Sequence, residues 1–596
     1  MFSRLKKISS KIKSLSSIVD GSEAFVIKQL YENSSSAILY IASDGSTMEQ
    51  IASVLQYILP DVNVLAFPAW DTVPYDRISP NVNIVAERVN VLAYLAHNPT
   101  SKKNRIILTS VGSAIQKLPH KKVFLNSVKH IKVRGELSFA AFLHYVSVNG
   151  YTRVEQVMEP GEYAVRGDIL DIFPVGTDNP LRIDLFGDEV EKIRTFDVLS
   201  QRTTGEKEYY TFQAAGEVVL DENTVKNFRS NYRESFGVAT KNDEIYEAIS
   251  NSKKYMGMEN WLPFFYEEKL PSIFDYVPQA AIVFGRNFET ALKSKNDSII
   301  DHYQARLEAL SIKNNNKEVD NYRPVSPELM FMRIEEIMPK ANIMFNSLNM
   351  PDSDNNIDIK TVPIRDFSSA KNINPSQVYT ELSNTLIEYG KLKRIICCYS
   401  AGSRERIFTL LNENCGEKIN LSFAENWKEA ELKSQTSVVL AIINIPHGFR
   451  TDSYYFVSEQ DILGPKQNRR NYKKVTSKDF IADVSSLNIG ELVVHLEHGI
   501  GRFMGLENIS AGGADHDCLK IIYANDDKLF VPVENIEMVS RYGADDENIQ
   551  LDTLGGVAWE AKKAKVKKRI KELAEKLIAI AARRQLKQLA LRTLLP

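Results

Sequence analysis

The turn after the first apolar run is the place in the chain where nucleotide chemistry would be expected. Residues 35–45 read as a short buried strand running into a turn, and Asp44, Gly45, Ser46 and Thr47 occupy that turn. A phosphate-binding loop needs glycines, whose neighbouring backbone N–H groups wrap the phosphates, and a Lys followed by Ser or Thr. This turn has no Lys, and the carboxylate of Asp44 would repel a phosphate. We therefore predict a degenerate phosphate loop without catalytic residues, and no cofactor for this chain.

His495, Glu497 and His498 come nearest to the spacing of a metal site. They lie in the run 491–503, which reads as β-structure. Alternate side chains of a strand point to opposite faces, which would put His495 and Glu497 on one face and His498 on the other. The sequence therefore predicts no metal site.

The cysteines show no metal-binding or disulfide pattern. Cys397, Cys398, Cys415 and Cys518 form no CxxC pair and no Cys/His cluster with zinc spacing. Buried free thiols in a reducing cytoplasm are the predicted state.

The composition is that of an ordinary multidomain protein. The chain has 596 residues, a hydrophobic fraction of 43%, a charged fraction of 25% and a net charge of −2. This balance argues against a surface coated for DNA binding but allows a local basic patch. No apolar run approaches the roughly 18 residues of a membrane span. The basic start, residues 1–17, lacks the apolar core of a secretory signal and is predicted to be a surface helix, with a transit peptide as the alternative.

The elements that must position these residues divide the chain into several parts. Strand-like runs alternate with helical patterns over 1–130, which predicts a parallel α/β sheet. One such helix has Met48, Ile51, Leu55 and Ile58 on its apolar face. Residues 131–215 alternate apolar and polar side chains around Pro and Gly turns, which predicts a small antiparallel β-rich insertion. Residues 216–350 are mixed and mostly helical, and 349–358 reads as a linker.

The second half is predicted to contain two smaller folds. Residues 361–465 read as a small α/β domain with strands at 392–400 and 436–445, and 466–482 as a flexible basic linker. Residues 483–550 have the short β-runs of a small barrel of the Tudor or SH3 type. A long helix over 556–596 is basic, and Lys567, Lys568 and Arg569 are candidates for DNA contacts. The alternative for this helix is a solvated charged face beside an apolar packing face.

Three sequence blocks carry a resemblance to a known family. The block FPAWDTVPYDRISPNVNIVAERVNVL, residues 67–92, closely resembles the N-terminal region of the bacterial transcription-repair coupling factors and, more loosely, the UvrB excision-repair helicase. Residues 150–176 and 181–203 resemble the family's second domain, which is shared with UvrB and docks on UvrA. The family's first domain is a UvrB-like α/β domain with a degenerate phosphate loop, and we expect 1–130 and 216–350 to form it.

The resemblance of the second block implies specific UvrA contacts. Arg166, Arg182 and Phe186 match the positions that the family uses. The two guanidinium groups can form forked bonds to carboxylates, and the aromatic ring can anchor a hydrophobic contact. The alternative is that both arginines pair internally with acidic residues of the same module: Asp168, Asp184 or Asp188.

The third block, 491–513 with 518–542, resembles the family's RNA-polymerase-interacting domain, which is similar to CarD-type regulators. The resemblance implies that a strand edge over 505–513 pairs with the β subunit of RNA polymerase. Gly505, Leu506 and Ile509 are the candidate contacts.

Together these resemblances imply a cytoplasmic, monomeric repair factor that docks on stalled RNA polymerase and recruits UvrA for nucleotide excision repair. The full-length family uses ATP and magnesium to translocate on double-stranded DNA. No phosphate loop of a motor occurs in this sequence, so we expect a truncated form that is not an enzyme by itself. Two alternatives remain open: one half of a split translocase whose motor is a separate chain, and a UvrB-like DNA-binding protein without a polymerase partner.

Overall fold

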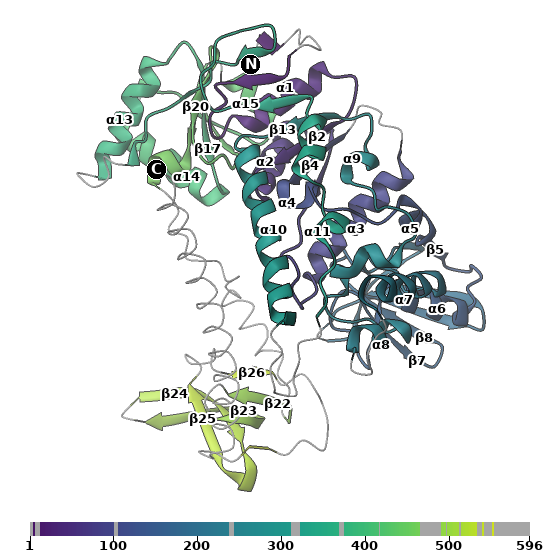
Figure 1. The fold of residues 1–596 in the computed structure, drawn as a ribbon. Helices are drawn as coiled ribbons and strands as arrows, with labels where there is room; N and C mark the ends of the chain where they lie inside the picture. The colour runs from purple at the N-terminus through teal and green to yellow at the C-terminus, as the bar shows by residue number, and fades with distance from the viewer. Residues whose placement is uncertain are drawn as a thin grey trace. The chain divides into compact units, whose positions relative to one another are not determined.

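In the computed structural model, the chain divides into two compact units, Met1–Lys466 and Gln467–Pro596 (Figure 1). The structure describes residues 4–5, 12–99, 105–198, 200–237, 243–311, 322–368, 375–415, 418–434, 436–464, 490–495, 498–511, 514–532, 539–541 and 551–552. Among these residues, no helix is long and apolar enough to cross a membrane.

A seven-stranded parallel sheet forms the centre of the first unit. Its strand order is β15-β1-β14-β13-β2-β4-β3. The strands span Asn356–Asp358 (β15), Ser14–Ser16 (β1), Ile343–Phe345 (β14), Ala281–Phe284 (β13), Ile38–Ala42 (β2), Arg105–Ser110 (β4) and Asn63–Phe67 (β3). Every residue of β2 is buried, as is typical of a parallel strand covered on both faces.

Helices that pack on this sheet follow the predicted pattern. They include α1 (Glu23–Asn33), α2 (Gly45–Ile58), α3 (Val82–His97), α4 (Val111–Ala114) and the long α10 (Phe288–Ser311). The four apolar residues predicted to share one face of α2 are all buried. The strand predicted within 35–45 is confirmed as β2, and β3 and β4 are further strands of the predicted alternation over 1–130.

Two predictions about this sheet are wrong. The start of the chain was predicted to be a surface helix, but its described part contains β1, which lies between β14 and β15 and buries Leu15 and Ser16 completely. The segment 349–358 was predicted to be a linker, but β15 occupies its end. Both strands are only three residues long. Their burial comes from partners more than 300 residues away, so no local periodicity could reveal them.

The β-rich insertion is confirmed as a mostly antiparallel module, here called the insertion module (β5 to β12). Its larger sheet has the order β11-β10-β9-β8-β7-β6, and only the pair β6/β7 is parallel. The strands span Thr152–Arg153 (β6), Glu162–Arg166 (β7), Ile169–Ile172 (β8), Leu181–Phe186 (β9), Glu189–Phe196 (β10) and Thr203–Lys207 (β11). A separate two-stranded ribbon consists of β5 (Lys129–Lys132) and β12 (Tyr209–Phe212).

A buried ion pair connects the exit of the insertion module to the parallel-sheet domain. Arg88 of α3 donates to both carboxylate oxygens of Glu217, at 2.6 and 3.1 Å. Both side chains are almost completely buried. The Arg88 guanidinium also donates to the carbonyl oxygen of Pro68 and lies 4.4 Å from the ring centre of Phe67. The indole of Trp70 donates to Glu217 at 2.8 Å, so the block 67–92 surrounds this ion pair.

The rest of the first unit is a helical region and a second α/β sheet. The helical region includes α7 (Glu222–Phe236), α8 (Glu244–Ser250) and α9 (Ile273–Tyr276). The second sheet has the order β16-β20-β21-β17-β19-β18. Its strands span Val362–Pro363 (β16), Phe449–Arg450 (β20), Tyr454–Ser458 (β21), Lys393–Cys398 (β17), Val438–Ile442 (β19) and Leu421–Ala424 (β18). The helices α13 (Pro375–Glu388), α14 (Ala401–Cys415), α15 (Trp427–Lys433) and α16 (Glu459–Leu463) accompany it. The strands predicted at 392–400 and 436–445 are confirmed.

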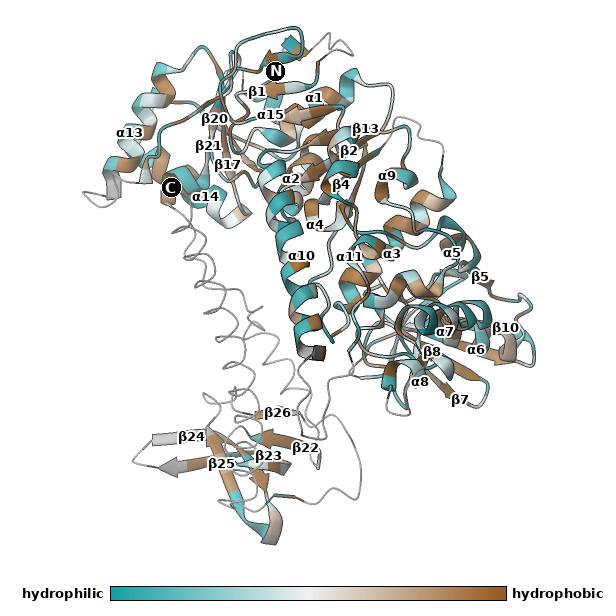
Figure 2. Ribbon diagram, in the orientation of Figure 1, coloured by the Kyte–Doolittle hydropathy of each residue, from teal (hydrophilic) through white to brown (hydrophobic). Residues whose placement is uncertain are grey.

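One apolar core joins the two α/β sheets of the first unit. The ring of Phe25 on α1 lies 5.6 Å from Trp427, 5.5 Å from Phe449 and 4.7 Å from Phe456, between ring centres. Figure 2 shows the strands of the two sheets largely in brown, the colour of hydrophobic residues, whereas α10 is largely hydrophilic. The two domains therefore share an interior rather than a polar boundary.

The second unit contains a five-stranded antiparallel sheet with the order β25-β24-β23-β22-β26. The strands span Lys528–Pro532 (β25), Ala514–Ile522 (β24), Gly499–Ala511 (β23), Leu492–His495 (β22) and Val539–Arg541 (β26). This confirms the predicted β-runs, whereas closure into a barrel stays a prediction. The predicted linker 466–482 and the terminal helix 556–596, with Lys567, Lys568 and Arg569, lie outside the described residues.

Candidate functional site

The three residues predicted to contact UvrA lie on one face of the larger insertion sheet. Arg166 ends β7 and pairs with Ile169 of β8, which in turn pairs with Asp184 of β9. Directly opposed residues of antiparallel strands share a face, and so do alternate residues along one strand. Arg182 and Phe186 therefore lie on the face that carries Arg166.

Phe186 is the most exposed aromatic side chain of this face. It is 81% exposed at the end of β9, where Gly187 turns the chain with a φ of 61°. The alternate residues of β9, Leu181, Ile183 and Leu185, are buried in the core of the module. The alternation that fills this core thus leaves Phe186 outside it, with nothing of the module covering most of its ring.

Arg182 is engaged within the module. Its Nε and Nη2 donate to the two carboxylate oxygens of Asp171, at 2.7 and 2.8 Å, and its guanidinium lies 4.7 Å from the ring centre of Phe196. The hydrogen bonds to Asp171 raise the pKa of Arg182. Internal pairing was the stated alternative, but the partner is Asp171 and none of the three acids considered. Asp184 instead forms an ion pair with Arg194.

Arg166 has a different environment. Its side chain is exposed, and its Nη2 donates to the carbonyl oxygen of Glu155 at 3.2 Å. No carboxylate of the described residues forms an ion pair with it. Of the two arginines, Arg166 is therefore the one whose charge is available to a partner.

Sequence reasoning missed Asp171 and Glu217. Both are acids almost fully buried, and each holds an arginine. The signal for Asp171 was its place inside the apolar run of β8, where an unpaired carboxylate would be strongly unfavourable.

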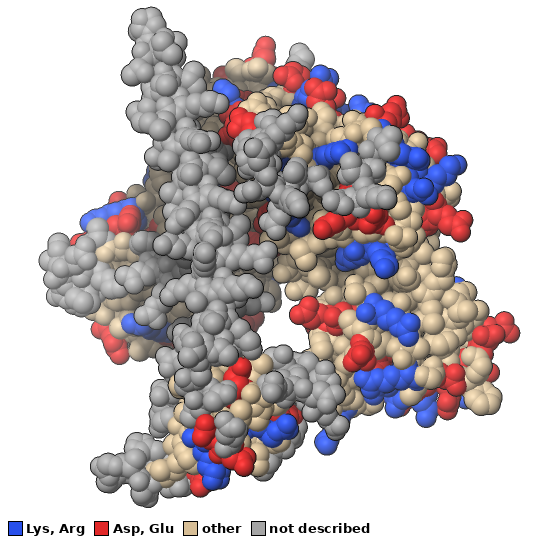
Figure 3. Space-filling view, turned by 60° about the horizontal axis from the view of Figure 1, so that its bottom comes forward, with Lys and Arg blue, Asp and Glu red and all other residues tan. Residues whose placement is uncertain are grey.

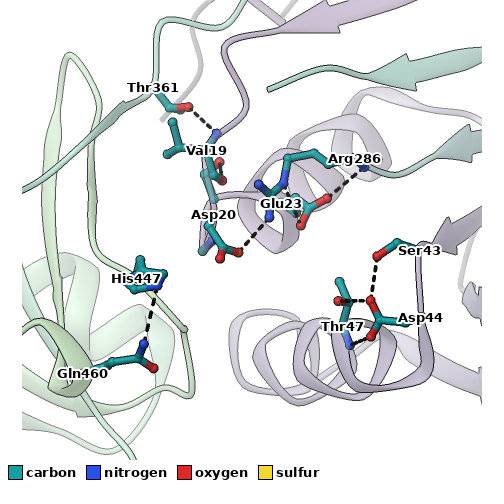
Figure 4. Close-up of polar contacts among 12 residues, drawn as sticks. Val19, Asp20, Glu23, Ser43, Asp44, Thr47, Arg286, Thr361, His447 and Gln460 are labelled. Carbon is teal, nitrogen blue, oxygen red and sulfur yellow. Dashed lines mark hydrogen bonds and ion pairs between the residues drawn. The ribbon is translucent and has the colours of Figure 1, made fainter. Parts of the chain in front are cut away.

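The turn predicted to be a degenerate phosphate loop contains its own anion. Asp44 caps α2: its carboxylate accepts hydrogen bonds from the Thr47 backbone N–H and hydroxyl, both at 2.9 Å, and from the Ser43 hydroxyl at 2.7 Å (Figure 4). Burial raises the pKa of Asp44, but these hydrogen bonds outweigh it, so the pKa is lowered. The carboxylate occupies the helix N-terminus, where a phosphate would otherwise be held.

A second acidic group lies near this turn. Asp20 accepts a hydrogen bond from Arg286 at 2.7 Å, and Glu23 also pairs with Arg286 (Figure 4). The guanidinium of Arg286 is thus already paired with two carboxylates. This arrangement disfavours a bound nucleotide further.

In the second unit, β23 extends beyond its neighbour β22. β22 pairs with Gly499 to Arg502, and the backbone of Phe503 bonds to Gly490 and Glu491. A bulge follows, where Gly505 has a φ of 111°, and Leu506 to Ala511 pair only with β24 among the described residues. We call the segment Leu506–Ala511 the β23 overhang. Its edge away from β24 is unpaired within the part of the chain that the structure describes.

The β23 overhang carries the predicted polymerase contacts. Leu506 is 68% exposed, and Ile509 is half-buried opposite His516. Between them, Glu507 forms an ion pair with Lys520 of β24 at 2.8 Å. An unpaired strand edge with apolar side chains beside it can bind an added strand through backbone hydrogen bonds and apolar contacts.

The two histidines are placed differently from the prediction. His495 ends β22, and β23 begins at Gly499 opposite it, so the chain reverses where one continuous alternation was assumed. The rings of His495 and His498 stack 4.7 Å apart instead of lying on opposite faces. Glu497 lies outside the described residues, and no cluster of three metal-ligating side chains occurs among those described.

Three of the cysteines match their prediction. Cys397, Cys398 and Cys518 are buried free thiols, whereas the side chain of Cys415 is outside the described residues. Burial raises the pKa of Cys397 and raises that of Cys398 to about 12. Neither thiol is therefore a nucleophile at neutral pH.

Comparisons with known proteins agree with this geometry. Residues 130–217 match the UvrB interaction domain, and residues 487–543 match the CarD-like/TRCF RID domain. The chain is 32% identical to the transcription-repair-coupling factor of Rickettsia bellii over 94% of this chain and 48% of that protein. It is 30% identical to the one from Escherichia coli over 95% of this chain and 48% of that protein.

The chain spans about half the length of the curated relatives it matches. The two matched domains coincide with the insertion module and with the sheet of the second unit. The chain is therefore a homologue of the transcription-repair-coupling factors over nearly all of its length, with a UvrB interaction domain and a CarD-like/TRCF RID domain.

Proposed function

We propose that this chain is a docking platform for transcription-coupled nucleotide excision repair, in which the insertion module binds UvrA and the second unit binds RNA polymerase. The observation that carries the proposal is the exposed Phe186 on the same sheet face as the unpaired charge of Arg166. This face lies within the region that matches the UvrB interaction domain.

The two arginines have different roles in the proposed UvrA interface. Phe186 supplies a large apolar anchor, and Arg166 supplies forked donors for a carboxylate of the partner. Arg182 stabilises the sheet face by pairing with Asp171, because its Nε and Nη2 both donate to that carboxylate. Arg182→Ala is thus expected to lower UvrA affinity and thermal stability together, whereas Arg166→Ala lowers the affinity alone.

Titration of purified UvrA onto the immobilised full chain tests this interface. Phe186→Ala should weaken binding by about ten-fold or more, since buried aromatic anchors contribute roughly 2 kcal/mol. Tyr209→Ala is the matched control, because Tyr209 is 72% exposed in the same module but belongs to the β5/β12 ribbon. Parent-like affinity in the Phe186→Ala and Arg166→Ala double variant would remove the proposal.

For RNA polymerase, we propose that the β23 overhang pairs with a strand of the β subunit. Added-strand pairing supplies backbone hydrogen bonds, and Leu506 and Ile509 supply apolar contacts beside Gly505. Ile509→Arg should abolish the complex with isolated β subunit, measured by co-elution. Lys528→Glu on β25, at the other end of the sheet, is the control. Persistent co-elution of the Ile509→Arg variant would contradict strand pairing.

We further propose that the Asp44 turn binds no nucleotide, and that ATP and magnesium act only in the motor of full-length relatives. Duplex DNA remains a partner through Lys567, Lys568 and Arg569. ATP hydrolysis by the purified chain would contradict the first statement. Activity that emerges only on adding a separate motor chain would support the split translocase, and UvrA binding without polymerase binding would support the UvrB-like alternative.

A further inference from the structure

The β5/β12 ribbon has one buried face and one uncovered face. Ile131 and Phe212 point into the core of the insertion module and are buried. The register pairs Lys132 with Tyr209 and His130 with Thr211. Opposed residues share a face, so these four side chains form the outer face of the ribbon. Tyr209 is 72% exposed there, so one face of its ring is open to a stacking partner.

Positive charge lies on and beside this outer face: Lys132 is on it, and Arg134 follows β5, whereas Lys129 opposes Phe212 on the other face. The stretch from Lys121 to Arg134 contains four Lys and one Arg but no Asp or Glu. Lys129, Lys132 and Arg134 are exposed, and none of them forms an ion pair with a described residue. Lys122 is also exposed, but it lies 4.0 Å from Glu268. Over the described part of the face that Figure 3 shows, Lys and Arg lie among Asp and Glu. The stretch 121–134 contains no acid, although the exposed Glu208 directly precedes Tyr209.

From this placement we propose that the outer face of the β5/β12 ribbon binds single-stranded nucleic acid, with Lys132 and Arg134 on phosphates and Tyr209 stacked on a base. An exposed aromatic ring opposite a cation on one ribbon is the combination that single-strand binding uses. Duplex DNA would use the cations but leave the ring without a partner, and an acidic protein segment would do the same. A 2.8 Å hydrogen bond between Nδ1 of His130 and the Thr211 hydroxyl holds the His130 ring on the outer face of the ribbon.

This surface and the proposed UvrA face use different residues, although the Arg134 backbone N–H donates to the Val190 carbonyl oxygen of β10. Phe186 and Arg166 belong to the six-stranded sheet, whereas the four ribbon residues belong to the two-stranded sheet. Each surface offers one exposed aromatic residue, Phe186 or Tyr209. The two proposals can therefore fail independently.

The test is fluorescence anisotropy of a labelled oligothymidylate titrated with the full chain at several salt concentrations. Tyr209→Ala should weaken binding at least about five-fold, as expected for loss of one stacked base, while Tyr209→Phe should bind like the parent. Lys132→Gln should reduce the slope of log affinity against log salt by about 0.7, the value for one phosphate contact on a single strand. Phe186→Ala and Lys226→Gln, an exposed Lys on α7, should leave both quantities unchanged.

Three results would overturn the proposal. The first is a parent-like affinity and salt slope in the variant that combines Lys132→Glu, Arg134→Glu and Tyr209→Ala. The second is a loss of duplex binding in this variant with unchanged single-strand binding. The third is a poly-glutamate peptide that binds as tightly as the oligonucleotide and with the same dependence on Tyr209, which would assign the ribbon to an acidic protein segment. Crosslinking of a bromodeoxyuridine oligonucleotide to the peptide that contains Tyr209 would support the site directly.

Discussion

At the scale of single residues, the ion pair between Arg88 and Glu217 is the most consequential contact described. Removing one member of a buried pair leaves an uncompensated charge, which destabilises a fold by about 3 kcal/mol or more. We expect Glu217→Gln to lower the first thermal unfolding midpoint by several degrees, measured by scanning calorimetry. Glu268→Gln is the matched control, because Glu268 pairs with Lys122 at the surface. An unchanged midpoint in the Glu217 variant would mean that the module is held by other contacts.

Asp44 gives a second prediction at this scale, and it depends on pH. Asp44→Ala removes the cap of α2 and should destabilise the protein by about 1 kcal/mol, whereas Asp44→Asn keeps an acceptor. Because the pKa of Asp44 is lowered in the folded protein, its charge stabilises the fold above the pKa of the unfolded chain. The stability difference between the parent and Asp44→Asn should therefore shrink as the pH falls below about 4. Urea titrations at pH 7 and pH 3 measure it, and a difference that grows with acid would contradict the cap.

At the scale of elements, one buried side chain links β15 to β1 in addition to the backbone pairing of the two strands. Asn356 is buried, and its Nδ2 donates to the Ser16 hydroxyl at 3.0 Å and to the carbonyl oxygen of Pro351 at 2.9 Å. Asn356→Ala should cost about 2 kcal/mol, because the buried groups lose their donor. The exposed neighbour Asn355→Ala should leave the thermal midpoint unchanged. Equal midpoints for both variants would show that β15 contributes little to the sheet.

The same elements show what the sequence could and could not predict. β2, β4 and β17 were predictable, because their apolar runs are continuous and end at polar turns. β1 and β15 were not, since their residues are mostly polar and β1 becomes buried only between β14 and β15, which are distant in sequence. The reversal between His495 and His498 was missed for a related reason: both arms of the hairpin are β-structure, so the alternation looked continuous. For the site, exposure of Phe186 follows from alternation, but the pairing of Arg182 with Asp171 required the register.

At the scale of the whole molecule, the two docking surfaces belong to different compact units. We expect them to act independently. Phe186→Ala should remove UvrA and retain the β subunit, and Ile509→Arg should do the reverse, measured by co-elution from mixtures that contain both partners. Loss of both partners from either variant would show that the surfaces are coupled.

The position of β1 has a consequence for how the protein is made. This strand leaves the ribosome well before its neighbours β14 and β15, which begin at Ile343 and Asn356. At roughly 5–20 residues per second, translation needs on the order of 20–70 s to deliver them. During that interval Leu15 has neither of the two strands with which it pairs in the folded sheet. The central sheet can therefore be completed only after β14 and β15 have been synthesised. We expect ribosome-bound chains that stop before residue 343 to be protease-sensitive near β1.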